Sequence, residues 1–225
     1  HNVEYASEIL VSSEQLPRRV LARAVAIAPV MDLALLTVED QAFEQAQMPV
    51  QFCDELPADN QPVLALGYPL GVDTVSVTKG VVSRVEYANY GPLEHGLRVQ
   101  IDAALNPGNS GGAVLVGGKL VGIASSKVRE GDNIGYVIPT EEIRLFLDDI
   151  KDGHYDGKLD MGFVFHPLEN GPLREYLGVP QDVFGVVVYD ALATAPNTLR
   201  RWDVISGIDG YAIDDRGFVQ LEDGR

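Results

Sequence analysis

Short apolar runs separated by turn residues dominate the first 138 residues of the chain. The runs are rich in Val, Ile, Leu and Tyr, and Gly, Pro, Asn and Asp separate them at the spacing typical of β-barrels and β-sandwiches. Nine of them predict strands: EILVS, RVLARAVAIA, LALLTV, PVLALGYP, TVSVTKGVVSRVEY, LRVQIDAA, GGAVLV, KLVGIASSKV and IGYVIP. Gly117-Gly118 fits a tight hairpin turn. The more polar residues 40–61 predict a connection between two β units.

One segment, PTEEIRLFLDDIKDG, has the period of an α-helix. Four apolar residues recur at i, i+3, i+4 and i+7 and form one stripe that we expect to pack on the barrel: Ile143, Phe146, Leu147 and Ile150. Thr140 is the expected N-cap, and two glutamates in the first turn suit the helix dipole. Lys151 lies near the end, and Gly153 is the expected stop.

The pattern changes near residue 159. A strand GFVF, a helical stretch PLREYLGV, a strand GVVVYDA, a helical stretch TAPNTLRRW and a strand DVISGIDG follow one another. This alternation predicts a separate small α+β domain. We therefore expect two domains, residues 1–153 and residues 159–225.

Composition narrows the classes of function. The chain is 46% apolar and 22% charged, which suits globular domains with a core. Its formal net charge of −16 argues against a nucleic-acid binder, and no run of eighteen apolar residues is present to span a membrane. Cys53 is alone, so no disulfide forms within the chain and the compartment stays open. The four histidines lack metal-ligand spacing; we expect no metal and no cofactor.

The stretch ALNPGNSGGAV places Ser110 among three glycines at the start of an apolar strand. A nucleophilic serine needs a base, and the oxyanion it creates needs preorganised N–H donors. Glycine reaches the backbone angles that aim such donors at one point, and here Gly108 and Ser110 are the candidates. Taken alone, the window fits a glycine-rich turn before the strand AVLV equally well.

Asp32 stands directly before the apolar strand LALLTV. A carboxylate there is costly to bury unless a donor satisfies it, and a histidine ring N–H is one such donor. The alternative is an ordinary aspartate in a turn at the start of a strand. Only one histidine, His1, precedes Asp32 in the chain.

Three segments in this order resemble the chymotrypsin-like proteases of the HtrA/Deg family, closest to the plant-type Deg branch: HNVEYASEILV, DLALL, and DAALNP followed by GNSGG. The resemblance implies a mostly β, chymotrypsin-like double β-barrel and an ATP-independent serine endopeptidase that cleaves unfolded or exposed segments. It makes Ser110 the nucleophile, His1 the general base and acid, and Asp32 its orienting partner. Gly108 and Ser110 then supply the oxyanion-hole N–H groups.

The resemblance also bears on regulation and specificity. Asn109 stands where digestive relatives carry an aspartate that binds a new N-terminal ammonium, and a neutral amide forms no such ion pair. We therefore expect control by ordering of residues 104–109 and 124–134, without cleavage of a pro-segment. Leu105, Ile134 and Tyr136 are candidates for an apolar S1 wall, which favours small aliphatic residues before the scissile bond.

The stretch LDMGFVF resembles the carboxylate-binding loop of PDZ domains, which capture a peptide C-terminus and add the peptide to a sheet edge. Gly162 would free the loop, with Met161 and Phe163 flanking the pocket. Residues 185–210 resemble the rest of such a domain, with Arg201-Trp202-Asp203 in place of a glycine-containing turn.

The family resemblance implies a homo-oligomer, a trimer or larger, located in a periplasm or an organelle. It also leads us to expect a fragment: a first barrel without its N-terminal strands, and a PDZ domain without its C-terminal end. The second candidate function is a chaperone-like quality-control module that holds peptide segments without cutting them.

Overall fold

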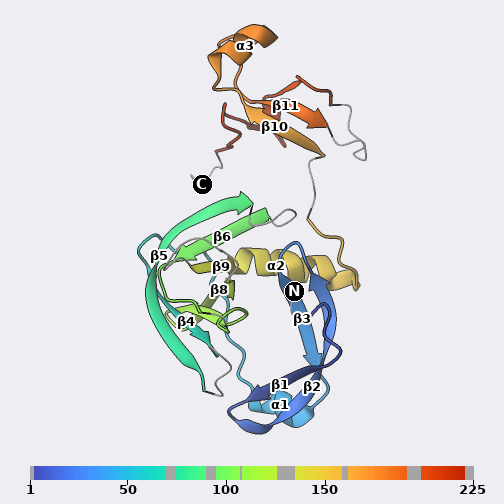
Figure 1. Ribbon diagram of the computed structural model, residues 1–225, viewed down its shortest axis with the longest axis vertical. Coiled ribbons are helices and arrows are strands. Elements are labelled where there is room, and N and C mark those ends of the chain that lie inside the picture. The colour runs from blue at the N-terminus through green and yellow to red at the C-terminus, as the bar shows by residue number, and fades with distance from the viewer. Residues whose placement is uncertain are drawn as a thin grey trace. The chain divides into compact units, whose positions relative to one another are not determined.

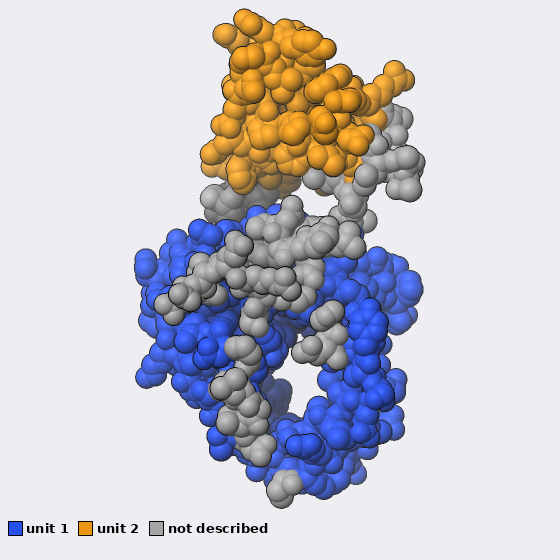
Figure 2. All heavy atoms as spheres, in the orientation of Figure 1, with its two compact units in different colours: residues 1–158 blue, residues 159–225 orange. Residues whose placement is uncertain are grey.

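The computed structural model describes residues 3–68, 74–89, 95–106, 108–125, 135–158, 162–191 and 199–220. The chain divides into two compact units, residues 1–158 and residues 159–225 (Figure 2). Within the described part of the chain, no helix is both long and apolar enough to cross a membrane.

Unit 1 begins with an antiparallel sheet in the order β1-β2-β3, formed by β1 (Ile9–Ser13), β2 (Leu16–Ala28) and β3 (Leu33–Val38). A short helix, α1 (Gln41–Ala46), follows, and the Asp40 carboxylate caps it by accepting the N–H of Phe43 at 2.9 Å. Residues 40–61 thus connect two β units, as their polarity predicts, but include a helical turn.

A closed six-stranded barrel follows in unit 1 (Figure 1). Its strands are β4 (Pro62–Gly67), β5 (Ser76–Asn89), β6 (His95–Ile101), β7 (Ala113–Val116), β8 (Lys119–Ser125) and β9 (Gly135–Pro139), in the closed order β4-β5-β6-β9-β8-β7. The residues of its core that have no exposed surface are all β-branched: Val82, Val99, Ile101, Val114 and Val137. Gly117 and Gly118, with φ of +57° and +83°, close the β7–β8 hairpin, so the predicted tight turn is confirmed.

The predicted helix is α2 (Thr140–Asp149), followed by a 3₁₀ turn at Ile150–Asp152. The predicted N-cap is wrong: Pro139 holds that position, because β9 runs directly into the helix and Thr140 is already its first residue. Gly153, at φ +90°, ends the 3₁₀ turn as expected. The apolar stripe packs against Met31 and Leu33 of the N-terminal sheet as well as Leu120 and Ile138 of the barrel. Helix α2 therefore joins the sheet to the barrel.

Unit 2 contains β10 (Phe163–Pro167), α3 (Gly171–Leu177), β11 (Val186–Ala191) and β12 (Val204–Ile205), with the sheet order β10-β11-β12. A small hairpin of β13 (Gly207–Ile208) and β14 (Tyr211–Ala212) follows. The Arg174 guanidinium donates to the Val183 carbonyl at 2.6 and 3.0 Å and pairs with Asp215 at 3.4 Å. These bonds connect α3 to the Val183 carbonyl and to the turn that contains Asp215.

The helix predicted over TAPNTLRRW falls mostly on residues outside the described ranges, and its last part is a turn. The Asp203 N–H donates to the Arg200 carbonyl at 3.0 Å, and the Arg200 N–H donates to the Asp203 carboxylate at 2.7 Å. Trp202 lies inside this turn at φ +79°. Its ring meets Tyr176 and Tyr189 edge-on, with centroids 6.4 and 6.3 Å away, and the Arg201 guanidinium lies 4.7 Å from its centre.

An ion pair is buried where α2 meets β6. Glu142, which is 3% exposed, lies 2.6 Å from the Lys158 ammonium and accepts the N–H of Leu97 at 2.8 Å. A Cβ atom at Gly96 would overlap the Lys158 Nζ, so glycine leaves the space for the pair. The pair ties the helix, strand β6 and the last residue of unit 1 together.

We expect Glu142→Gln to lower the free energy of unfolding by about 3 kcal/mol, because it leaves the Lys158 ammonium buried without a counter-charge. The amide oxygen can still accept from Leu97, so the change isolates the charge. The control is Asp148→Asn, which removes the exposed Asp148–Lys151 pair and should cost less than about 0.5 kcal/mol. Urea unfolding followed by circular dichroism measures both; equal stabilities for the two variants would contradict the role of the buried pair.

Candidate active site

The loop that carries Ser110 consists of two consecutive β-turns. The Asn109 N–H donates to the Asn106 carbonyl at 2.9 Å, and the Gly112 N–H donates to the Asn109 carbonyl at 2.9 Å. A glycine with positive φ stands at the third position of each turn, Gly108 at +102° and Gly111 at +84°. Such angles are costly for residues with a Cβ atom. The two turns place the exposed Ser110 between two glycines.

Strands β8 and β4 hold this loop from opposite sides. On the β8 side, the Gly111 N–H donates to the Ala124 carbonyl and the Ala124 N–H donates to the Gly112 carbonyl, both at 2.8 Å. On the β4 side, the Tyr68 N–H donates to the Gly108 carbonyl at 3.3 Å. A Cβ atom at Gly112 would overlap the carbonyl oxygen of Leu66, so only glycine allows this close approach.

Asn109 is buried beneath the loop, with 3% of its surface exposed. Its Nδ2 donates to the Ala104 carbonyl at 3.4 Å, while its Oδ1 packs on the Cα of Gly67 and has no hydrogen-bond partner among the described residues. The side chain thus fills its site as a neutral amide. Control of the site by ordering of residues 104–109 and 124–134 stays a prediction, and residues 126–134 lie outside the described ranges.

Residues 29–32 form the loop of the β2–β3 hairpin, which the Ala28–Leu33 pair closes. Asp32 is the last residue of this loop. Its N–H donates to the Pro29 carbonyl at 3.2 Å, and its backbone is left-handed, with φ +57°. Aspartate tolerates this conformation better than most residues do. The preceding Met31 is 2% exposed and fixes the hairpin loop in the core.

One apolar cluster connects Asp32 to the Ser110 loop. It contains Met31 and Leu33, the two neighbours of Asp32, and also Ala113, where β7 begins three residues after Ser110. The fold therefore brings two of the three predicted triad residues, Asp32 and Ser110, to the border of the same core, although they are 78 positions apart in sequence. The third, His1, lies outside the described residues.

The described S1 candidates lie on opposite faces of β9. A Cβ atom at Gly135 would point at the Leu105 side chain and Ile101, so Leu105 packs on the core-facing side. Tyr136 is the next residue, and successive residues of a strand face opposite ways. It pairs with Gln100 and contributes, after the dominant Glu86, to raising the pKa of Arg84. These two residues do not form one wall, and Ile134 lies outside the described residues.

Sequence reasoning missed two residues beside Ser110. A cavity of about 390 Å³ adjoins the serine and is lined by Leu66, Gly67, Tyr68, Val75, Gly108, Ser110, Gly111, Gly112 and Ala113. Tyr68 follows β4 and Val75 precedes β5, and both are exposed apolar residues, at 47% and 41%. From the sequence, Tyr68 and Val75 are recognisable only as residues at the ends of strands. Their position beside the serine depends on the pairing of β4 with β7, which the sequence does not show.

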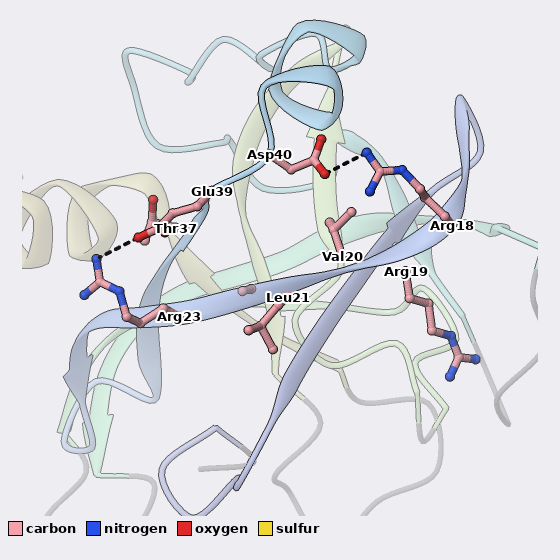
Figure 3. Close-up of a pocket in the computed structure, with 9 residues that line it drawn as sticks. Arg18, Arg19, Val20, Leu21, Arg23, Thr37, Glu39 and Asp40 are labelled. Atoms are coloured by element: carbon pink, nitrogen blue, oxygen red, sulfur yellow. Dashed lines mark ion pairs between the residues drawn. The ribbon is translucent and has the colours of Figure 1, made fainter.

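A second cavity, of about 420 Å³, lies on the N-terminal sheet, and Figure 3 shows its lining side chains. Arg18 points to Asp40 at 2.7 Å and Arg23 to Glu39 at 3.9 Å, while Arg19 points away. The Phe43 N–H, together with Arg18, lowers the pKa of Asp40. None of the nine lining residues is a serine, cysteine or histidine, so the described lining of this cavity lacks the serine–histidine pair that the predicted triad requires.

Two of the three predicted peptide-binding residues of unit 2 are described. Gly162 is buried, with a left-handed φ of +69°, and stands directly before β10. The Phe163 ring is half-buried and lies 6.5 Å from the ring of Phe165. Met161 lies outside the described residues.

The closed barrel and the preceding sheet have the chymotrypsin-like fold of serine proteases. Residues 2–123 match the family model of the trypsin-like peptidase domain, and the chain belongs to this family. The predicted fold class is thereby confirmed for unit 1. The relatives described next confirm the predicted HtrA/Deg resemblance.

The relatives are proteases of the Do-like and HtrA type. Protease Do-like 4, mitochondrial, of Arabidopsis thaliana is 38% identical over 88% of this chain and 39% of its own length. Protease Do-like 2, chloroplastic, of the same plant is 39% identical over 97% of this chain and 37% of its own. The chain thus spans about two fifths of each. Among solved structures, the HtrA-type protease AlgW with a tripeptide superposes with a TM-score of 0.75 at 29% identity, over 96% of this chain and 70% of that one.

We expect Asn109→Asp to destabilise unit 1 by about 2 kcal/mol at neutral pH, because a carboxylate buried at this position loses its hydration. Burial raises the pKa of such a carboxyl group above its unfolded value. The loss of folding free energy is therefore greatest at a pH above the raised pKa. It disappears as the pH falls below the pKa of about 4 that the group has in the unfolded chain.

Asn106→Asp is the matched control, since Asn106 lies in the same loop but is exposed. Urea unfolding of both variants at about pH 8 and about pH 5 gives the comparison. A deficit in Asn109→Asp that grows toward acid would contradict the buried neutral site.

Proposed function

We propose that the chain contains the catalytic domain of an ATP-independent serine endopeptidase that cleaves unfolded or exposed protein segments. The observation that supports this most directly is the exposed Ser110 between two glycine turns, held from both sides by strands and bordering the same core as Asp32. The match to the trypsin-like peptidase family and the protease names of the relatives agree with it.

In this mechanism Ser110 Oγ attacks the scissile carbonyl carbon while His1 accepts the hydroxyl proton. Asp32 accepts the other ring N–H of His1, which holds the tautomer and stabilises the imidazolium. The N–H groups of Gly108 and Ser110 stabilise the oxyanion. His1 then returns the proton to the leaving amine, and an acyl-enzyme remains. Water, deprotonated by His1, hydrolyses the ester and restores the serine.

Unit 2 acts in this proposal as a peptide-binding PDZ domain. Strand β10 has one partner, β11, in the described sheet, so its other edge is the place where an extended peptide adds as a strand. Gly162, in its left-handed conformation before β10, would let backbone N–H groups of the loop between Met161 and Phe163 bind a terminal carboxylate. Of the solved relatives, AlgW is described with a decapeptide and with a tripeptide. We further propose a homo-oligomer, a trimer or larger.

The first test is labelling with a fluorophosphonate probe, with the modified peptide identified by mass spectrometry. We expect a covalent adduct on Ser110 and none in Ser110→Ala, because only an activated serine reacts. Ser83→Ala, which removes an exposed serine of β5, should label as the wild type does. A folded protein that binds unfolded clients but is not labelled would favour the holding module over the protease.

The second test is Asp32→Asn. Asparagine suits the left-handed backbone at position 32, so the fold should persist while the charge that orients His1 is lost. We expect kcat for a peptide substrate to fall by about 10⁴-fold at neutral pH, with little change in KM. A fall of less than about tenfold would show that Asp32 does not serve as the orienting acid.

A further inference from the structure

Unit 2 carries an exposed cluster of aromatic rings, which we call the aromatic patch. Its members Tyr176, Tyr189 and Trp202 are 78%, 41% and 37% exposed. The Trp202 ring meets both tyrosines edge-on, and the exposed His166 ring lies 4.7 Å from Tyr189. Helix α3, strands β10 and β11 and the turn at residues 200–203 each contribute a ring. Contacts between distant parts of the chain therefore assemble the patch.

The backbone at Trp202 is strained. Its φ of +79° lies in the left-handed region, where a bulky residue is an outlier and glycine is favoured. The turn is fixed to β11, because the Trp202 N–H donates to the Val188 carbonyl and the Val188 N–H donates to the Asp203 carbonyl, both at 2.8 Å. Strained residues of this kind cluster at functional sites. A large exposed ring at a position that suits glycine therefore points to a role in binding.

Tyr189 is placed by a second irregularity, a β-bulge in β11. Val164 of β10 pairs with Asp190, and Phe165 pairs with Val188, so Tyr189 is the extra residue between them. A bulge re-aims a side chain out of the regular alternation of its strand. The ring pair at the centre of the patch thus depends on two departures from regular backbone geometry.

Arg201 supplies the patch with a positive charge. Its guanidinium lies over the rings of both Tyr189 and Trp202, 4.7 Å from each centroid. In the described part of the chain it has no ion pair and no hydrogen-bond partner, whereas Arg174 and Arg216 each pair with an aspartate. Contact with the rings holds the guanidinium in place, and its N–H groups remain available to bind a carboxylate in bidentate geometry.

The surroundings of Arg201 favour an anionic ligand. Its neighbour Arg200 is also exposed and makes no ion pair with a described residue, so two adjacent positive charges face solvent. The nearest acidic residue in sequence is Asp203, and its carboxylate already accepts the Arg200 N–H at 2.7 Å. A carboxylate from a partner would therefore be the counter-ion of this turn.

We propose that the aromatic patch binds an acidic segment of another protein. One carboxylate of the segment pairs with Arg201, and an apolar side chain beside it packs on Tyr176 and Trp202. Aromatic residues and arginine are enriched at the energetic centres of protein interfaces. The interaction uses acidic side chains and needs no terminal carboxylate, so it differs from the peptide capture proposed for the loop before β10. It also does not depend on the proposed protease activity.

The test uses the full chain with Ser110→Ala, so that no probe is cleaved. The probe is a fluorescein-labelled peptide in which aspartate alternates with leucine and phenylalanine, and its C-terminus is amidated to exclude capture of a terminal carboxylate. Fluorescence anisotropy measures the dissociation constant. We expect binding to weaken about tenfold when asparagine replaces every aspartate, and by a similar factor when serine replaces the apolar residues.

Two variants test the patch itself. Arg201→Gln should bind the aspartate and asparagine peptides equally, because it removes the charge that distinguishes them. Trp202→Gly should weaken the aspartate peptide about tenfold. Glycine suits the left-handed backbone at position 202, so unit 2 should stay folded, which an NMR amide spectrum checks. The matched control is Arg216→Gln, since Arg216 also lies over an aromatic ring, that of Phe218 at 5.2 Å, but outside the patch. It should bind as the wild type does.

Three results would overturn the proposal. The first is equal binding of the aspartate and asparagine peptides by the chain with Arg201 intact. The second is an unchanged dissociation constant in both Arg201→Gln and Trp202→Gly. The third is equally tight binding of an uncharged proline-rich peptide, which would assign the patch to the recognition of proline by aromatic rings. None of these results bears on the labelling of Ser110, so the proposed protease function stands or fails separately.

Discussion

The close contact between Gly112 and the Leu66 carbonyl determines where the candidate nucleophile lies. Because no Cβ atom separates them, the start of β7 packs directly against the end of β4. The two turns before β7 therefore contact Gly67 and Tyr68. The hydrogen bonds to Ala124 complete the frame from the other side. The serine is thus positioned by backbone contacts of its neighbours, which explains why so many glycines surround a single hydroxyl group.

A second constraint brings Asp32 to the border of an apolar core that the Ser110 loop also borders. Helix α2 presents one apolar stripe to two structures at once, the N-terminal sheet and the barrel. Met31 enters this shared core beside Asp32, and Ala113 enters it beside the serine loop. Burial of the Met31 and Ala113 side chains is favourable because it removes apolar surface from water. It leaves Asp32 and Ser110 at the border of this core. The site is therefore built where two β units are joined.

The sequence was sufficient for features that depend on neighbouring residues. All nine strand segments of unit 1 and the Gly117-Gly118 turn follow from alternation and turn chemistry, and the turns around Ser110 follow from its glycines. The N-cap failed because Thr140 has suitable chemistry, but β9 continues to Pro139 and leaves it no capping position. Leu105 and Tyr136 were both predicted as apolar residues of one S1 wall, but they lie on opposite faces of β9 because successive residues of a strand face opposite ways. Tyr68 and Val75 escaped because only the pairing of β4 with β7 brings them to Ser110.

The turn at Trp202 has a consequence for how the chain can be observed. Trp202 is the single tryptophan of the 225 residues, and it belongs to unit 2, where tyrosine rings and the Arg201 guanidinium surround it. Selective excitation of tryptophan therefore reports the state of unit 2, while the circular dichroism of the strands is dominated by unit 1. Unfolding followed by both signals distinguishes the two units without any added label, and coincident transitions would reveal that they unfold together.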